Sequence, residues 1–173
     1  NHSKLGMHSI LIAVGIINGI HNLLKIDLNL KWPNDIYYKT KKIGGILIET
    51  KMKNEKTFLN IGMGINVNEN LEDFPDELQN TALSIKMIVD KPVQRELLLS
   101  YLLNSIDELL NNINLDYLIN TYNDKCININ NKVSFQYQNK LETGILKKIN
   151  RKGQTVIELN DQFILHNGPI INI

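Results

Sequence analysis

The chain has 173 residues, of which 43% are hydrophobic, and its 19 basic side chains nearly balance its 18 acidic ones. This length suits one globular domain, or one domain with a small appendage, and allows a buried core. A net charge of +1 excludes a global attraction to nucleic acid or to an anionic membrane, so any anion site must be built locally. The single cysteine, Cys126, excludes an internal disulfide or a multi-cysteine metal site and indicates a reducing, cytoplasm-like compartment.

The first apolar segment is expected to be a buried helix. Ser9 is a candidate N-cap for a helix running to about Lys25, because apolar residues recur at three- and four-residue steps. The run at 10–20 is about half of the ~20 residues that a membrane span requires. Gly15 and Gly19 form a small-xxx-small pair, which also occurs in membrane helices. The polar residues around them favour a core helix, so no membrane span is predicted.

Short strands and hairpins follow this helix. We expect strands at 28–31, 36–38, 43–50 and 57–67, with a polar hairpin connection at 51–56. Pro33 has no backbone N–H and therefore ends the first strand. Successive hairpins predict a mixed or antiparallel sheet, against which the first helix packs.

The remainder of the chain is predicted to be helical and then β again. A loop, a short helix and a longer helical region are expected at 68–80, 81–89 and 93–124, the last with a break near 111–114. After Cys126 the apolar period changes to two, which predicts strands at 133–137, 141–149, 155–159 and 163–166. The fold class is therefore α+β, with one domain at residues 1–128 and a small barrel-like β-domain at residues 129–173.

Unusual residues concentrate between residues 28 and 49. Four lysines share this segment with a Gly44–Gly45 step, namely Lys31, Lys39, Lys41 and Lys42. Positive charge beside backbone N–H groups that glycine leaves bare suits a phosphate or a carboxylate. A solvated basic turn explains the same lysines, and their spacing does not decide between the two.

Asn34 and Asp35 directly follow a Trp32–Pro33 corner. A rigid corner points an amide and a carboxylate from a fixed backbone, whereas an Asx turn is the structural alternative. Trp32 is more often a core residue than a stacking platform. Glycine within a strand, as at Gly44–Gly45, often marks only a bulge.

Three motifs occur in order along this part of the chain: KWPND at 31–35, KIGGILIE at 42–49 and GMGINVN at 62–68. Their composition, order and spacing resemble the central motifs of biotin protein ligases, also called biotin–[acetyl-CoA-carboxylase] ligases or holocarboxylase synthetases. The resemblance extends through TALS at 81–84 to nearly the whole chain. It implies a partial catalytic domain of the class II aminoacyl-tRNA synthetase/biotin ligase-like type, followed by a small SH3-like β-barrel.

The resemblance implies a two-step reaction. The biotin carboxylate attacks the α-phosphate of ATP to give biotinyl-5′-AMP and pyrophosphate, and a lysine of a carboxylase's biotin carboxyl carrier domain then accepts the biotin. By resemblance, Lys42 is the catalytic lysine and touches both the carboxylate and the α-phosphate. Negative charge develops on the phosphoryl oxygens, so this cation and the Mg²⁺ that enters with ATP would stabilise the transition state.

The resemblance also assigns the substrate- and nucleotide-binding residues, which are Lys31, Trp32, Asn34, Asp35, Gly44, Gly45 and Asn66. The glycines would let biotin and the adenylate approach the strand closely. Asp35 is also the candidate contact for Mg²⁺, and Asn66 is associated with the adenine. Lys31 and Trp32 either shape the same pocket or are architectural, and both readings stay open.

The family's glycine- and arginine-rich loop, GRGRxGRxW, would lie upstream of the first helix, and the sequence does not contain it. We therefore expect the C-terminal portion of a longer enzyme, which binds biotin poorly unless another chain supplies the missing part.

Two other functions stay open: a non-catalytic nucleotide- or carrier-protein-binding remnant, and a relative of lipoate ligases, against which the Trp-Pro-Asn-Asp string argues. A homodimer is also left open. A cytoplasmic location is expected, and no DNA-binding or zinc site is predicted.

Overall fold

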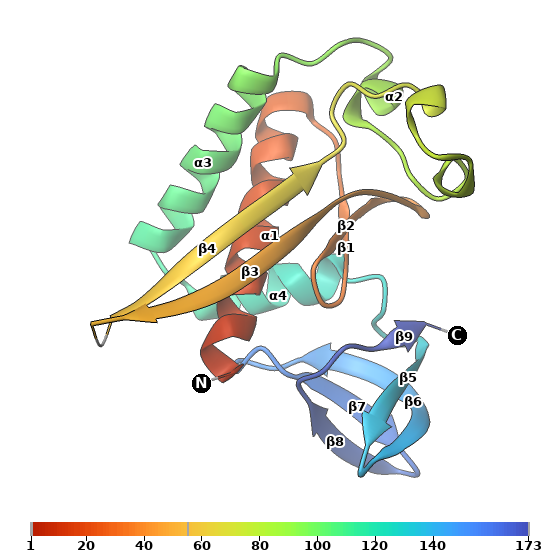
Figure 1. Ribbon diagram of the computed structural model, residues 1–173. Coiled ribbons are helices and arrows are strands. Elements are labelled where there is room, and N and C mark those ends of the chain that lie inside the picture. Colours follow the sequence, from red (N-terminus) through yellow and green to blue (C-terminus); the bar gives the residue numbers. More distant parts are fainter. Residues whose placement is uncertain (1, 55, 173) are drawn as a thin grey trace.

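The computed structural model describes residues 2–54 and 56–172 (Figure 1). The first part contains α1 (His2–Leu24), β1 (Asn29–Lys31), β2 (Asp35–Tyr38), β3 (Lys41–Lys53) and β4 (Lys56–Ile65). The middle contains the 3₁₀ turns η1 (Leu71–Asp73) and η2 (Asp76–Leu78) and the helices α2 (Ile85–Val89), α3 (Arg95–Asn111) and α4 (Leu115–Lys125). The last part contains β5 (Lys132–Tyr137), β6 (Lys140–Ile149), β7 (Thr155–Leu159), β8 (Gln162–His166) and β9 (Ile171–Asn172).

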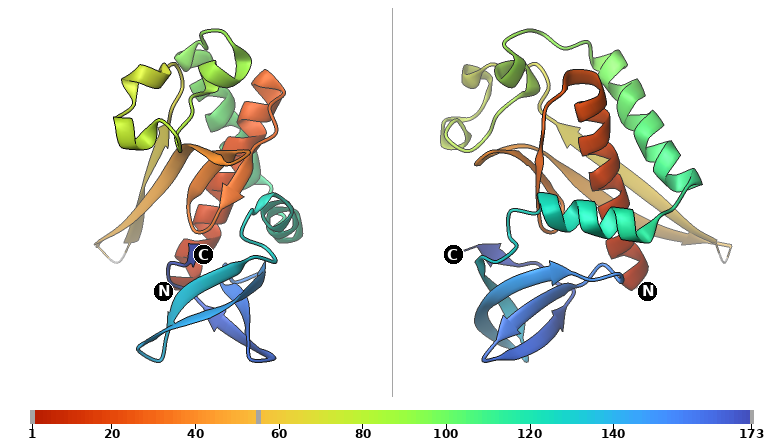
Figure 2. Two further views of the ribbon diagram at one scale, coloured as in Figure 1. Left: turned by 90° about the vertical axis from the view of Figure 1, so that its right-hand side faces the viewer. Right: turned by 180° about the vertical axis from the view of Figure 1, so that it is seen from behind.

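The strands form two sheets in which neighbouring strands are antiparallel. The first sheet has the order β1-β2-β3-β4 and the second has the order β8-β7-β6-β5-β9. Helices α1 and α3 lie together behind β3 and β4 in the view of Figure 1, and the second sheet lies below them, beside α4 and the start of α1 (Figures 1 and 2). The predicted α+β class with antiparallel sheets and packed helices is confirmed.

Helix α1 is the central helix of the core. Its residues 6–24 are long and apolar enough to cross a membrane by length and composition, but 56% of the most apolar stretch is buried inside the fold. A Cβ at Gly15 would lie 2.6 Å from the Ile106 Cγ1 atom, and one at Gly19 would lie 2.9 Å from the Leu102 Cα atom. The small-xxx-small pair therefore lets α3 pack closely against α1 within the core.

Three predicted boundaries are wrong: one because the helix begins earlier than expected, and two because strand pairing takes up residues that were assigned elsewhere. Ser9 does not cap α1, since the helix already includes residues from His2 onward. The expected connection at 51–56 is mostly strand, because β3 and β4 pair as far as Lys53 and Lys56.

The third correction concerns the helix expected at 81–89, which begins only at Ile85. Ser84 caps it, with its side chain accepting a hydrogen bond from the Met87 N–H at 3.2 Å. The residues before Ser84 instead pair with β3: the Lys42 N–H donates to the Thr81 carbonyl (2.8 Å), and the Leu83 N–H donates to the Lys42 carbonyl (2.9 Å). The N–H and the carbonyl of Lys42 are thus both bonded to the segment at 81–83.

The helical region breaks where predicted. Helix α3 ends at Asn111, and α4 begins after Asn114, whose side chain accepts a hydrogen bond from the Tyr117 N–H at 3.0 Å. Residues 112–114 therefore form a short turn that folds α4 back across the lower half of α1 (Figure 2).

Candidate active site

The motif residues converge at the hairpin formed by β2 and β3. The register of this hairpin shifts between Ile36 and Tyr37, opposite the fully buried Ile43. Such a bulge places two residues of one strand opposite one of the other and re-aims the side chains beside it. The Lys42 Nζ atom here lies 2.6 Å from the Asp35 Oδ1 atom. The bulge thus lies beside an ion pair that joins the KWPND motif to the KIGGILIE motif.

The pair is partly open to solvent. The side chain of Lys42 is 44% exposed and that of Asp35 is 25% exposed. An ion pair with this exposure contributes only about 0–1 kcal/mol to folding, because water screens it. Its importance is therefore chemical: a cation is held in a defined place and stays accessible to a ligand.

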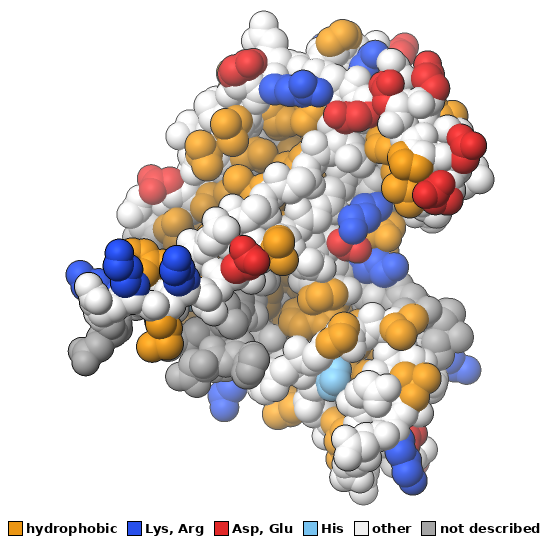
Figure 3. Space-filling model, viewed as in Figure 1, with side chains coloured by type: hydrophobic (Ala, Val, Ile, Leu, Met, Phe, Trp, Pro, Cys, Tyr) orange, Lys and Arg blue, Asp and Glu red, His pale blue; other side chains and the backbone are white. Residues whose placement is uncertain are grey.

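An open hollow of about 460 Å³ lies beside the ion pair on the solvent-facing side of β3 and β4. It is lined by Asn34, Asp35, Lys42, Gly45, Ile46, Leu47, Gly62, Met63 and Gly64. No heavy atom lies closer than 3.8 Å to a Cβ placed on Gly62 or Gly64, so the floor of the hollow is bare backbone. Figure 3 shows basic and acidic side chains side by side at the edge of this face. Such a surface admits a flat ligand close to the backbone.

The two glycines of the Gly44–Gly45 step differ in their surroundings. A Cβ at Gly44 would lie 2.5 Å from the Gly64 carbonyl oxygen, so this glycine is required by the packing of β3 on β4. A Cβ at Gly45 would lie 3.3 Å from the Asp35 Oδ1 atom and 3.6 Å from the Lys42 Nζ atom. Gly45 therefore keeps space open beside the ion pair.

Asn34 is bonded twice to the same residue of β3. Its side-chain Nδ2 donates to the Ile46 carbonyl at 2.6 Å, and the Ile46 N–H donates to the Asn34 carbonyl at 2.9 Å. These two bonds tie the corner after β1 to the strand that carries the glycines. Asn34 thus has a structural role at the edge of the hollow.

Four of the predicted site residues do not line the hollow, namely Lys31, Trp32, Gly44 and Asn66. The Lys31 Nζ atom lies 5.3 Å from the centroid of the Tyr37 ring, and Trp32 is in the core with 6% of its surface exposed. The Asn66 side chain donates to the Leu83 carbonyl at 3.2 Å and so ties the end of β4 to the segment before α2. The structure brings together Asn34, Asp35, Lys42 and Gly45 at the hollow, while Gly44 lies just beneath it.

GMGINVN at 62–68 is one of the three motifs, but its glycines, Gly62 and Gly64, are not among the predicted site residues. Folding residues 41–65 as one hairpin with its turn after Lys53 pairs Gly45 with Gly64 and Leu47 with Gly62. That pairing joins the second and third motifs in one surface. The signal in the sequence that could have identified Gly64 is that it and Gly45 lie at similar distances on either side of the polar turn after Lys53.

Two ionisable groups lie behind the corner. Burial raises the pKa of the Tyr122 phenol well above its ordinary value, and negative charge on Cys126 and then on Asp35 adds to this effect. Burial likewise raises the pKa of the Cys126 thiol, and backbone hydrogen bonds, first that of Asn128, partly oppose it. Both groups stay protonated near neutral pH, and Cys126 is a free, buried thiol.

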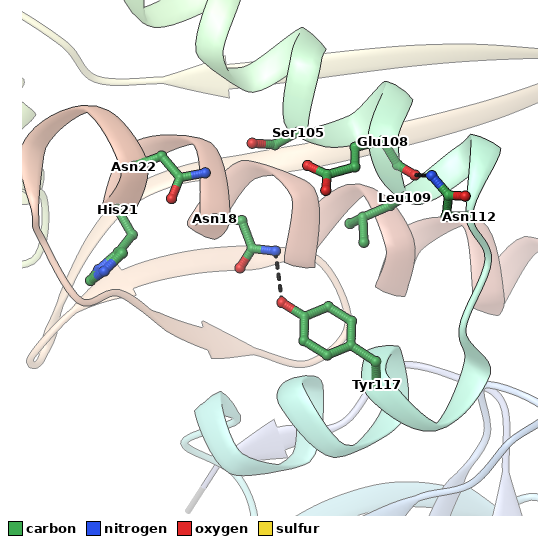
Figure 4. Close-up of a pocket in the computed structure, with 8 residues that line it drawn as sticks. All are labelled: Asn18, His21, Asn22, Ser105, Glu108, Leu109, Asn112 and Tyr117. Carbon is green, nitrogen blue, oxygen red and sulfur yellow. Dashed lines mark hydrogen bonds between the residues drawn. The ribbon is translucent and has the colours of Figure 1, made fainter.

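A second hollow, of about 480 Å³, lies among α1, α3 and α4 (Figure 4). Its lining residues are Asn18, His21, Asn22, Ser105, Glu108, Leu109, Asn112 and Tyr117, and the Asn18 Nδ2 atom donates to the Tyr117 hydroxyl at 3.0 Å. Among these eight residues there is no lysine or arginine, whereas the hollow on the sheet has Lys42 beside bare backbone. A phosphate or carboxylate is therefore favoured at the sheet.

The N-terminal part of the chain matches a known family. The model of the Biotin/lipoate A/B protein ligase family matches residues 2–68. The bifunctional ligase/repressor BirA of Bacillus subtilis is 36% identical over 96 residues, which are 55% of this chain and 30% of that protein. The human biotin–protein ligase is 38% identical over 61 residues, which are 33% of this chain and 8% of that protein. The matched segments thus cover less than a third of these relatives.

Solved structures resemble nearly all of the chain. The biotin protein ligase of Aquifex aeolicus has a TM-score of 0.82 and 23% identity, covering 96% of this chain and 74% of that one. The same enzyme in complex with biotin and ATP has a TM-score of 0.81 and 22% identity, covering 96% of this chain and 71% of that one. These likenesses establish the fold. By sequence, residues 2–68 match the Biotin/lipoate A/B protein ligase family, and 96% of the chain has the fold of a solved biotin protein ligase.

Proposed function

We propose that this chain carries the adenylation site of a biotin protein ligase, which activates biotin with ATP and transfers it to a lysine of a biotin carboxyl carrier domain. One observation carries the proposal: the Lys42 ammonium is fixed by Asp35 at 2.6 Å beside a hollow floored by bare glycine backbone. A related enzyme has been solved in complex with biotin and ATP. The proposed substrates are therefore biotin and ATP.

Lys42 would act as the catalytic cation. When the biotin carboxylate attacks the α-phosphate, negative charge shifts onto the phosphoryl oxygens and the departing pyrophosphate. A lysine ammonium has three rotatable donors and can bridge a carboxylate and a phosphate oxygen at once. Because the Lys42 backbone is bonded to the segment at 81–83 through its N–H and its carbonyl, and its ammonium is paired with Asp35, little reorganisation is needed at the moment of reaction.

The remaining predicted residues would serve the nucleotide and the shape of the pocket. Among the described residues that line the hollow, Asp35 alone has a carboxylate, and Mg²⁺ is commonly held through one or two carboxylates together with substrate phosphates. This donor set fits a Mg²⁺ ion that arrives with ATP and neutralises charge on its phosphates. Asn66 would lie near the adenine, while Lys31 and Trp32 would support the pocket from outside the hollow.

The finer architecture follows the same proposal. We assign residues 1–128 to a catalytic domain of the class II aminoacyl-tRNA synthetase/biotin ligase-like type and residues 129–173 to a small SH3-like β-barrel. We place the protein in the cytoplasm, in keeping with the single buried thiol, and leave a homodimer as an open part of the proposal.

The proposal is tested by incubating the chain, beside a version with the upstream glycine- and arginine-rich loop restored, with ATP, Mg²⁺ and biotin and measuring biotin-dependent pyrophosphate release and biotinyl-5′-AMP. Addition of an apo carrier domain then tests the transfer step. We expect Lys42→Met to lower adenylate formation by about 100-fold or more, as removal of a fixed charge-stabilising donor does in other enzymes. Urea unfolding of the variant serves as the control for folding.

Two results would count against the proposal. ATP that binds to the version with the loop restored without forming adenylate would identify a nucleotide-binding module instead of an enzyme. NMR shifts from ATP that map to the hollow of Figure 4, with none at Gly45 or Gly64, would place the site elsewhere.

A further inference from the structure

We infer that Asn128, assisted by Tyr122, is a positioning residue that holds the Trp32–Asp35 corner and thereby sets the Lys42–Asp35 pair. Neither residue belongs to the three motifs or to the hollow. The consequence for adenylation rests on the proposed function, whereas the effect on the geometry of the pair does not.

Asn128 lies in the segment between α4 and β5 and has no exposed surface. Its Oδ1 atom accepts a hydrogen bond from the Trp32 N–H at 2.7 Å and another from the Cys126 thiol at 3.5 Å. Pro33, which follows Trp32, has no backbone N–H. Asn128 therefore binds the last backbone donor before the corner turns, across 96 positions of sequence.

Tyr122, on α4, holds the same corner one residue further along. Its hydroxyl donates to the Pro33 carbonyl at 3.4 Å. Its ring meets the Trp32 ring edge-on, with centroids 6.2 Å apart and planes at 82°. The phenol stays protonated over the working pH range, so the hydroxyl remains a donor.

The segment that carries Asn128 is itself anchored on both sides. The Ile127 N–H donates to the Leu30 carbonyl at 2.8 Å, which joins the segment to β1. The Asn130 N–H donates to the Leu146 carbonyl at 2.7 Å, which joins it to β6. Trp32 also donates from Nε1 to the Gly168 carbonyl at 3.4 Å. The corner is thus fixed from the side opposite the hollow.

The backbone between Trp32, which Asn128 holds, and the Lys42–Asp35 ion pair is tightly restrained. Pro33 restricts the backbone φ angle of the corner, Asn34 is bonded twice to Ile46, and Asp35 pairs with Lys42. A shift at Trp32 is therefore passed to Asp35 through two restrained residues. A displacement of a few tenths of an ångström matters there, because an ion pair at hydrogen-bond distance weakens as soon as its geometry is lost.

Asn123 provides a matched control. It lies on α4, its Oδ1 accepts from the Ile149 N–H at 2.7 Å, and its Nδ2 donates to the Ile149 carbonyl at 3.0 Å. Asn123→Ala and Asn128→Ala each leave one backbone N–H without its side-chain acceptor, so both variants should lose stability for the same reason. Only Asn128 touches the corner.

The experiment measures hydrogen exchange at the Ile46 amide, which donates to the Asn34 carbonyl, together with the ATP affinity of each variant by calorimetry. After correction for global stability, we expect Asn128→Ala to speed exchange at Ile46 by about tenfold, the effect of weakening one hydrogen bond, and to weaken ATP binding by a similar factor. Asn123→Ala should leave both unchanged. Tyr122→Phe removes only the hydroxyl and should produce a smaller change at Ile46 of the same kind.

Equal corrected exchange at Ile46 in Asn128→Ala and Asn123→Ala would overturn the inference and leave Asn128 with a merely structural role. Should Asn128→Ala fail to fold, an unchanged Ile46 amide in Tyr122→Phe would overturn it as well. If the unmodified chain binds no ATP, the proposed function fails, while the exchange at Ile46 still decides whether Asn128 positions the corner.

Discussion

The same substitution at two adjacent glycines should produce two different defects. In Gly44→Ala the new methyl carbon would lie 2.5 Å from the Gly64 carbonyl oxygen and 3.3 Å from the Ile65 Cα atom. Both neighbours belong to the backbone of the paired strand, which has to move as a whole. Overpacking of this kind costs about 1–3 kcal/mol of unfolding free energy.

In Gly45→Ala the nearest neighbours are side-chain atoms, the Asp35 Oδ1 at 3.3 Å and the Lys42 Nζ at 3.6 Å. These can rotate, so we expect the unfolding free energy to change by less than about 1 kcal/mol. Alanine also lowers the conformational entropy of the unfolded chain, which offsets part of any loss of stability. The methyl group nevertheless displaces the carboxylate from Lys42 and narrows the hollow, so ATP affinity should fall by about tenfold, the equivalent of one hydrogen bond.

Urea unfolding measures the first effect and calorimetry with ATP and Mg²⁺ measures the second. Gly62→Ala separates the two causes of lost ATP affinity, because its methyl group also lies at the hollow but would meet nothing closer than 3.8 Å and would not touch the ion pair. The reasoning is refuted if Gly45→Ala loses as much stability as Gly44→Ala, or if Gly45→Ala binds ATP as tightly as the unmodified chain does.

Three further predictions concern the cation, the buried acids and the helix packing. Lys42→Arg keeps the charge but replaces a point charge by a rigid fork, so ATP binding should persist while adenylate formation, followed by pyrophosphate release, falls. The pKa values of Cys126 and Tyr122 are raised in the folded state, so these groups lose protons first in the unfolded chain. The unfolding free energy should therefore be steady below pH 9.0 and fall above it, by at most about 1.4 kcal/mol per pH unit for each group. Urea unfolding at a series of pH values should show a shallower fall in Cys126→Ala. Gly19→Ala should cost about 1–3 kcal/mol in the same assay, because its methyl carbon would lie 2.9 Å from the Leu102 Cα atom, and an unchanged midpoint would contradict the close packing of α1 on α3.

Much of the local structure follows from the sequence because it depends on neighbouring residues. Apolar periodicity indicates α1, α3 and α4, and the short alternating runs indicate the strands of both sheets. Boundaries were less certain where pairing with a distant segment decided them, as at 81–84, which looks helical but pairs with Lys42. There the tertiary partner overrides local preference.

By itself, the sequence determined the family motifs, the cluster of lysines and glycines and the identity of Lys42 as the residue to test. Only the tertiary structure decided that Gly44 serves strand packing while Gly45 borders the ion pair, and that Trp32 belongs to the core. Only the tertiary structure identified Asn128 as a partner of the corner, through a hydrogen bond to Trp32 that spans 96 positions. Such contacts leave no periodic pattern in the sequence, because they depend on how separate elements pack and not on the residues beside them.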